Sequence, residues 1–192
     1  AVAEAIKQEW ENVGGKIDAA KMPITKYMNT LLDRTQPQRA QMNALLVEYI
    51  HHDALCYFAG AADEEFNALQ SQTWLPIIEQ FNKKFDLKIQ TTSGIMPLMQ
   101  DEAISDFAAH YTASLSPTEF IAFYQLVTLT GSFILGVLIF TSDMNPQEAL
   151  DISLLEEDRN IQKWGEDPTT ADHRKKKQAE WDEALQLFKL VK

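Results

Sequence analysis

Apolar residues recur every three to four positions along most of this chain of 192 residues, a spacing that places them on one face of an α-helix. The spacing predicts helices over 2–10, 24–32, 42–50, 66–81, 101–114, 120–140, 146–164 and 171–190. Two short stretches, 54–59 and 87–92, suit extended backbone, and the first fits a helix end equally well. The pattern therefore predicts a mainly α fold with at most short extended segments.

The segment that begins at Phe120 and ends at Phe140 is apolar on all sides and contains no charged residue. Its length would allow a helix to cross a bilayer. However, no Lys or Arg occurs between Lys88 and Arg159, so the basic flank that usually orients a membrane helix is missing. We therefore expect one central helix that is wrapped by amphipathic helices and is not inserted in a membrane.

Several residues predict how these helices begin, bend and pack. Ser116, Pro117 and Glu119 form a capping box before the apolar segment. Pro76 lies inside a helical stripe, where proline is expected to cause a kink or a new start. Gly131 and Gly136 are expected at close contacts between helices. Helical spacing also predicts that three tryptophans are in the core; these are Trp74, Trp164 and Trp181.

Composition limits the classes of function. The formal net charge is −11 and the pI is about 4.8, so nucleic acid is not an expected partner, because binding it requires Lys and Arg at the phosphates. The single cysteine, Cys56, cannot form an internal disulfide, which suggests a reducing compartment. The length suits a single domain over residues 1–192.

The residues that could perform chemistry are few. His51, His52, Asp53 and Cys56 are the densest set of possible metal ligands, but neighbouring helical residues point in different directions and no second cluster has zinc spacing. Asp53 is better interpreted as a helix cap. No phosphate-binding, dinucleotide-binding or nucleophile-elbow motif occurs. We expect no enzymatic activity, no metal and no cofactor.

Four segments in order resemble one family, the assembly chaperones that bind the α subunit of the F-type ATP synthase in mitochondria and α-proteobacteria. The matching residues are Met22, Pro23, Ile24, Thr25, Asn29, Thr30 and Asp33; Asp53, Ala54, Leu55, Cys56 and Tyr57; Leu69, Gln70, Trp74 and Pro76; and Leu155, Glu156, Glu157, Ile161, Trp164 and Gly165.

The chain also departs from the family pattern. Leu75 stands where the family usually has Asp, Gln80 and Phe81 replace its second tryptophan, and Arg159 occupies a position that is commonly aromatic. Family members carry an N-terminal β-rich domain before the segment that resembles residues 1–10. This domain is absent from the sequence, so we expect the helical C-terminal domain by itself.

The resemblance implies that the chain holds the unassembled α subunit until it pairs with β, without ATP or a cofactor. By this analogy the client contact involves first Glu157, then Glu156, with Trp164 and Gly165 shaping the end of the helix. A second candidate contact, equally well explained by packing, comprises Met22, Pro23, Thr25, Asn29 and Asp33.

The expected state is a monomer in the mitochondrial matrix, or in the cytoplasm of an α-proteobacterium. An alternative is a helical interaction module or accessory subunit with another client. A membrane-anchored sensor that uses residues 120–140 is a further alternative.

Overall fold

The structure is a computed structural model that describes residues 1–94 and 97–192. Within these ranges it is mainly α, which confirms the predicted fold class. The α-helices are α1 (Val2–Glu11), α2 (Pro23–Thr30), α3 (Arg39–His51), α4 (Glu64–Phe85), α5 (Glu102–Ser114), α6 (Pro117–Thr130), α7 (Phe133–Phe140), α8 (Pro146–Ser153), α9 (Leu155–Trp164) and α10 (Pro168–Val191). Two short strands, β1 (Tyr57–Phe58) and β2 (Thr92–Ser93), pair in parallel.

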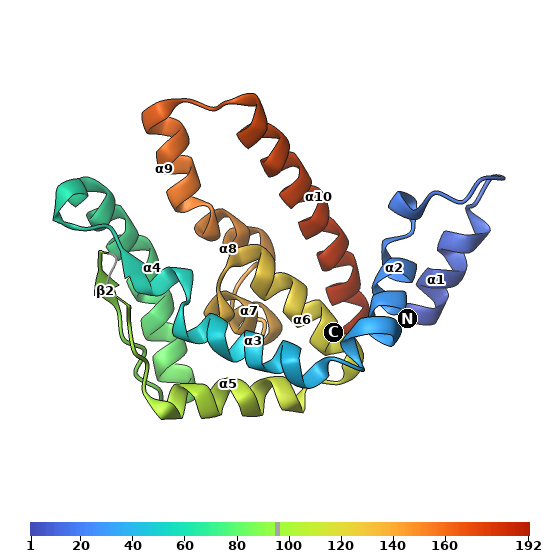
Figure 1. The fold of residues 1–192 in the computed structure, drawn as a ribbon, viewed down its shortest axis with the longest axis horizontal. Coiled ribbons are helices and arrows are strands. Elements are labelled where there is room, and N and C mark those ends of the chain that lie inside the picture. The colour runs from blue at the N-terminus through green and yellow to red at the C-terminus, as the bar shows by residue number, and fades with distance from the viewer. Residues whose placement is uncertain (95–96) are drawn as a thin grey trace.

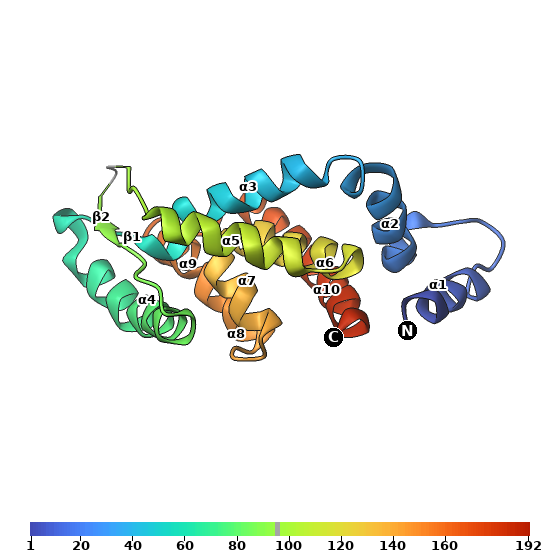
Figure 2. The ribbon, with the colours of Figure 1, turned by 90° about the horizontal axis from the view of Figure 1, so that it is seen from below.

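Helices α3, α6 and α7 lie at the middle of the molecule, as Figure 1 shows. Helix α10 packs along α6, and α5 packs along α3. Helix α4 lies at one end, and α1 and α2 lie at the other end, beside the C-terminus (Figures 1 and 2). The molecule is therefore elongated, and different helices form the surfaces at its two ends.

The core is built around α7. All eight of its residues are buried, and Phe123 of α6 lies edge-on to both Phe133 and Phe140, with ring centroids 5.2 and 5.3 Å apart. Gly136 permits this packing, because a Cβ atom there would lie 2.6 Å from Cγ2 of Val127. The apolar segment is thus buried by protein, as its composition predicts. In the described part of the chain, no helix combines the length and the apolarity needed to cross a membrane.

The prediction of one helix over residues 120–140 is wrong, because the segment forms α6 and α7. Gly131 ends α6 with a φ of 67°, a left-handed conformation that glycine adopts without strain. The side chain of Ser132 then caps α7 by accepting a hydrogen bond from the backbone N–H of Leu135, at 3.1 Å. Because residues 120–140 are apolar on both sides of Gly131, the hydrophobic pattern gives no sign of this break.

A buried carboxylate from another part of the chain holds the break in place. Asp53 has no exposed surface. One of its oxygens accepts hydrogen bonds from Ser132 Oγ and from the Ile134 N–H, both at 3.0 Å, and the other accepts from the Leu55 N–H at 3.1 Å. Burial raises the pKa of Asp53 to about 6, although these hydrogen bonds oppose the shift. Asp53 therefore caps the turn at Ala54–Cys56, as predicted, and also ties that turn to α7.

Three further elements differ from the prediction or decide between the alternatives that it left open. The predicted helix over 146–164 is interrupted at Leu154, which separates α8 from α9. Helix α4 continues through Pro76 without a new start. The stretch 54–59 is a 3₁₀ turn followed by β1, and 87–91 is extended loop that leads into β2.

Candidate functional site

Helix α9 carries the first predicted contact, and it contributes no buried residue to the core. Its first turn holds three carboxylates, which suit the positive end of the helix dipole. Gly165 follows it with a φ of 82° and ends the helix, as predicted. Helix α9 is therefore a surface helix whose side chains are available for other contacts.

The two acidic residues predicted together on α9 face different surfaces, because successive helical residues are about 100° apart. Glu156 lines a cavity of about 330 Å³ next to the start of α4. Glu157 points toward α10, where its Oε1 lies 3.8 Å from Nε of Arg174 and its side chain is 35% exposed. Arg174 also binds Asp158, with its Nη1 2.6 Å from Oδ1. Glu157 is thus both partly exposed and part of the connection between α9 and α10.

Ion pairs also hold the other side of α9 to α4. Nη2 of Arg159 lies 3.3 Å from Oδ1 of Asp63 and 3.1 Å from Oε2 of Glu65. Nζ of Lys163 lies 3.3 Å from Oδ2 of Asp63. Desolvation opposes the shift, but hydrogen bonds from the two cations lower the pKa of Asp63. Arg159, at a position that is commonly aromatic in the resembled pattern, therefore makes charged hydrogen bonds to the start of α4.

The prediction that Trp164 belongs to the core is wrong. It is 78% exposed at the end of α9, whereas Trp74 and Trp181 are 3% and 0% exposed. Helical spacing identifies a face of a helix, but it does not show whether another element covers that face. The structure thus leaves a large aromatic side chain in solvent at the end of an acidic helix.

The structure places most residues of the second predicted contact on one surface. Met22, Thr25, Asn29 and Asp33 line a groove of about 430 Å³, because a spacing of three to four residues keeps them on one face of α2 and the turn that follows. Pro23 does not line the groove; it is buried at the first position of α2. Four of the five predicted residues therefore share one surface.

The sequence did not identify the opposite wall of this groove. Trp10 of α1 and Ile17, which are 49% and 57% exposed, complete it. Glu9 of α1 accepts hydrogen bonds from the N–H groups of Ile24 and Thr25, both at 2.8 Å, and from Thr25 Oγ1 at 2.7 Å. The side chain of Thr25 is therefore engaged in joining α1 to α2, and this cap has no local sequence signal.

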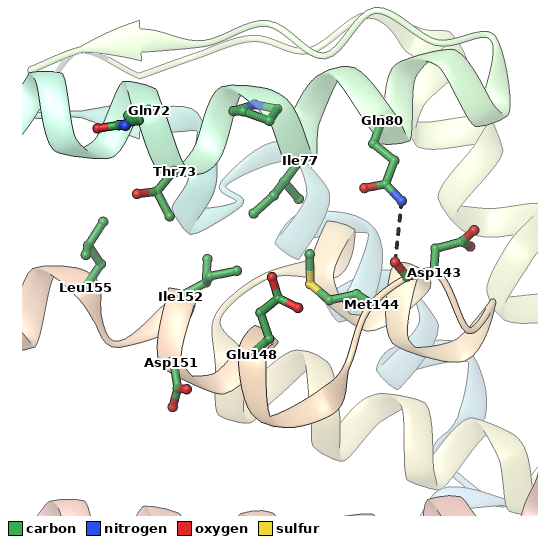
Figure 3. Close-up of a pocket in the computed structure, with 11 residues that line it drawn as sticks. Gln72, Thr73, Ile77, Gln80, Asp143, Met144, Glu148, Asp151, Ile152 and Leu155 are labelled. Atoms are coloured by element: carbon green, nitrogen blue, oxygen red, sulfur yellow. Dashed lines mark hydrogen bonds between the residues drawn. The ribbon is translucent and has the colours of Figure 1, made fainter.

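A third cavity, of about 530 Å³, lies between α4 and α8 and reaches the first residue of α9. Figure 3 shows Gln72, Thr73 and Ile77 on the α4 side, with Glu148 and Ile152 facing them from α8. The sequence prediction included none of these residues. Pro76 and Leu155, which also line this groove, belong to the motifs that carry the family resemblance.

The histidines have separate partners. Nε2 of His51 lies 2.7 Å from Ser105 Oγ, whereas Nδ1 of His52 lies 3.3 Å from the Tyr57 hydroxyl. Cys56 is buried, and burial raises the pKa of its thiol. Across residues 1–94 and 97–192, no group of three or more His, Cys, Asp or Glu side chains is arranged to hold a metal ion.

Comparison with known proteins finds one family that the chain resembles. The sequence model of the ATP12 chaperone protein family matches residues 1–82. The crystal structure of Atp12 from Paracoccus denitrificans matches the whole chain with a TM-score of 0.92 and 28% identity, over 82% of that protein. The chain is therefore similar to the ATP12 chaperone family in both sequence and fold. A point mutant of the Paracoccus denitrificans protein matches equally well, with a TM-score of 0.92 over 81% of its length.

The mitochondrial protein ATP12 of Saccharomyces cerevisiae is 24% identical over 211 residues, which cover 89% of this chain and 65% of the yeast protein. The chain thus spans slightly less than two thirds of the length of this ATP12 relative. These matches confirm the resemblance found in the sequence, and the matching family is described as one of chaperones.

Proposed function

We propose that this chain is an ATP12-type chaperone that binds the unassembled α subunit of the F-type ATP synthase and protects it from aggregation until it pairs with β. Holding requires only a complementary surface, so neither ATP nor another cofactor takes part. A subunit with a large obligate interface exposes apolar area before assembly, and such area promotes aggregation. A chaperone that covers this apolar area until assembly prevents the subunit from aggregating.

The observation that carries this proposal is the exposed face of α9. A helix without buried residues adds little to the core, yet this one ends in a tryptophan that is 78% exposed. Exposed Trp side chains are typical anchors of protein interfaces. The carboxylates of Glu156 and Glu157 lie on the same helix, and the net charge of −11 favours encounter with a cationic client surface. We assign Trp164, Glu156 and Glu157 to the client contact, with Gly165 ending the helix.

The groove lined by Met22, Thr25, Asn29 and Asp33 is proposed as a second contact. Trp10 supplies an exposed aromatic side chain at its edge. Because Thr25 is bonded to Glu9, it shapes the groove more than it contacts the client.

We further propose that residues 1–192 act as one monomeric helical chaperone domain. A continuous cluster of buried apolar side chains that extends from α2 to α10 supports this. The compartment is the mitochondrial matrix, or the cytoplasm if the chain is from an α-proteobacterium; the yeast relative is named as mitochondrial.

The test is co-expression with the α subunit of the same organism, followed by pull-down and by thermal unfolding of each variant. Trp164→Ala and Glu157→Lys are expected to reduce retention of the α subunit about tenfold or more, since one removes an anchor and the other reverses a charge. Trp164→Ala is expected to unfold near the wild-type temperature, because exposed substitutions usually change stability by about 0.5 kcal/mol or less. Glu157→Lys is expected to lower the unfolding temperature slightly, since it also removes the ion pair with Arg174.

Glu157→Gln is the control for the pair with Arg174. It removes that ion pair without reversing the charge, and pairs of this exposure contribute roughly 1 kcal/mol or less. If Glu157→Gln and Glu157→Lys both unfold at much lower temperature, the role of Glu157 is structural. Wild-type retention of the α subunit by Trp164→Ala and Glu157→Lys would contradict the assigned contact, and no retention by the wild type would contradict the proposed client.

A further inference from the structure

The groove between α4 and α8 has an apolar floor that the fold leaves partly open. Ile77 of α4 faces Met144 and Ile152 across the groove, and Leu155 lies at its end (Figure 3). Met144, Ile152 and Leu155 are only half-buried, although they pack against the core. Covering such side chains with apolar atoms of a partner is favourable, since it removes their surface from water.

Three carboxylates line this groove, and only one of them has a cationic partner among the described residues. Asp143 pairs with Lys84 of α4, whereas Asp151 accepts a hydrogen bond from the neutral Gln147. Glu148 projects from α8 toward α4 in Figure 3. The groove therefore combines apolar walls with uncompensated negative charge, which is complementary to Lys or Arg beside apolar side chains.

The position of the groove indicates a protein occupant. Leu155, at its end, is the first residue of α9 and is followed directly by Glu156. A client chain that contacts α9 can therefore continue into the groove without a gap.

We propose that the α4–α8 groove binds a segment of the client chain in which a Lys or Arg pairs with Glu148 and neighbouring apolar side chains cover Ile77 and Ile152. This inference rests on the proposed function, since the client is the unassembled α subunit. It adds a surface on which the sequence and the family resemblance place no contact.

Glu148→Lys is expected to weaken binding of the α subunit about tenfold or more, because it places a cation opposite the cation of the client. The matched control is Glu102→Lys. Glu102 is exposed and lies in the first turn of α5, as Glu148 lies in the first turn of α8, but it does not line the groove. Both changes place a cation at the positive end of a helix dipole, so only an effect specific to Glu148 reports on the groove.

A photo-crosslinking amino acid at Gln72 gives an independent measurement. We expect it to capture a segment of the α subunit, identified by mass spectrometry, that contains Lys or Arg. The same amino acid at Leu75, which is exposed but does not line the groove, is expected to capture much less.

The outcomes separate this inference from the proposed function. If the wild type retains the α subunit while Glu148→Lys binds equally well and Gln72 captures no more than Leu75, the groove proposal fails and the chaperone proposal stands. Crosslinks from Gln72 to a second copy of this chain would also overturn it. If the wild type does not retain the α subunit, both proposals fail.

Discussion

Replacing Asp53 with asparagine should change how the stability of the domain depends on pH. Asp53 is fully buried, and burial raises its pKa from 3.8 to about 6. The folded state therefore binds this proton more tightly than the unfolded state does. Between these two pKa values the free energy of unfolding falls as the pH rises, because the unfolded chain has already lost the proton.

The magnitude follows from the shift in pKa. A shift of about two units at roughly 1.36 kcal/mol each corresponds to about 3 kcal/mol. Below about pH 4 this penalty is absent, and above about pH 6 it is fully present. The asparagine side chain has no charge, so the variant lacks this penalty at every pH. Its amide NH₂ must, however, face one of the donors from Leu55, Ser132 and Ile134, and the lost hydrogen bond costs about 1–3 kcal/mol at all pH values.

The assay is urea unfolding followed by circular dichroism in steps from about pH 4 to about pH 7. The stability of the wild type relative to Asp53→Asn is expected to fall by about 3 kcal/mol across this range. Asp172→Asn, the same substitution at an exposed position, is the control for general effects of pH. A difference between wild type and Asp53→Asn that stays constant with pH would refute the account of a buried, protonatable capping carboxylate.

Two further substitutions test the packing around the proposed contacts. Glu9→Ala removes the acceptor for the N–H groups of Ile24 and Thr25 and should lower the free energy of unfolding by about 1–2 kcal/mol, as loss of a helix cap does; an unchanged urea midpoint would contradict this. Gly136→Ala places a methyl group 2.6 Å from Cγ2 of Val127 and should destabilise the domain by about 1–3 kcal/mol. Gly14→Ala, where no atom lies within 4 Å, serves as its control in thermal unfolding.

Local sequence was sufficient to predict most of the helices and several of their ends. The capping box at Ser116 is present, and Gly165 ends α9. These signals act between residues only a few positions apart, so the sequence displays them directly. Met22 and Asp33 line the same groove because helical spacing over a short stretch of chain sets a shared face.

The candidate contacts depended on information that local spacing lacks. Glu156 and Glu157 are neighbours in sequence, but α4 and α10 give them different surroundings. The wall that Trp10 adds to the α2 groove and the groove around Glu148 arise where separate helices meet. No pattern within a single helix could indicate them.

The sequence by itself determined that residues 120–140 are buried, because a segment without charge and apolar on all sides is stable only when it is removed from water. Only the tertiary structure decided that this segment is two helices, since the carboxylate that binds Ser132 and Ile134 comes from Asp53, about eighty positions earlier. It also decided that Trp164 stays in solvent while Trp181 is covered. The physical reason is that spacing fixes which side chains share a face, whereas contacts between distant segments determine which faces are covered and which polar groups are paired.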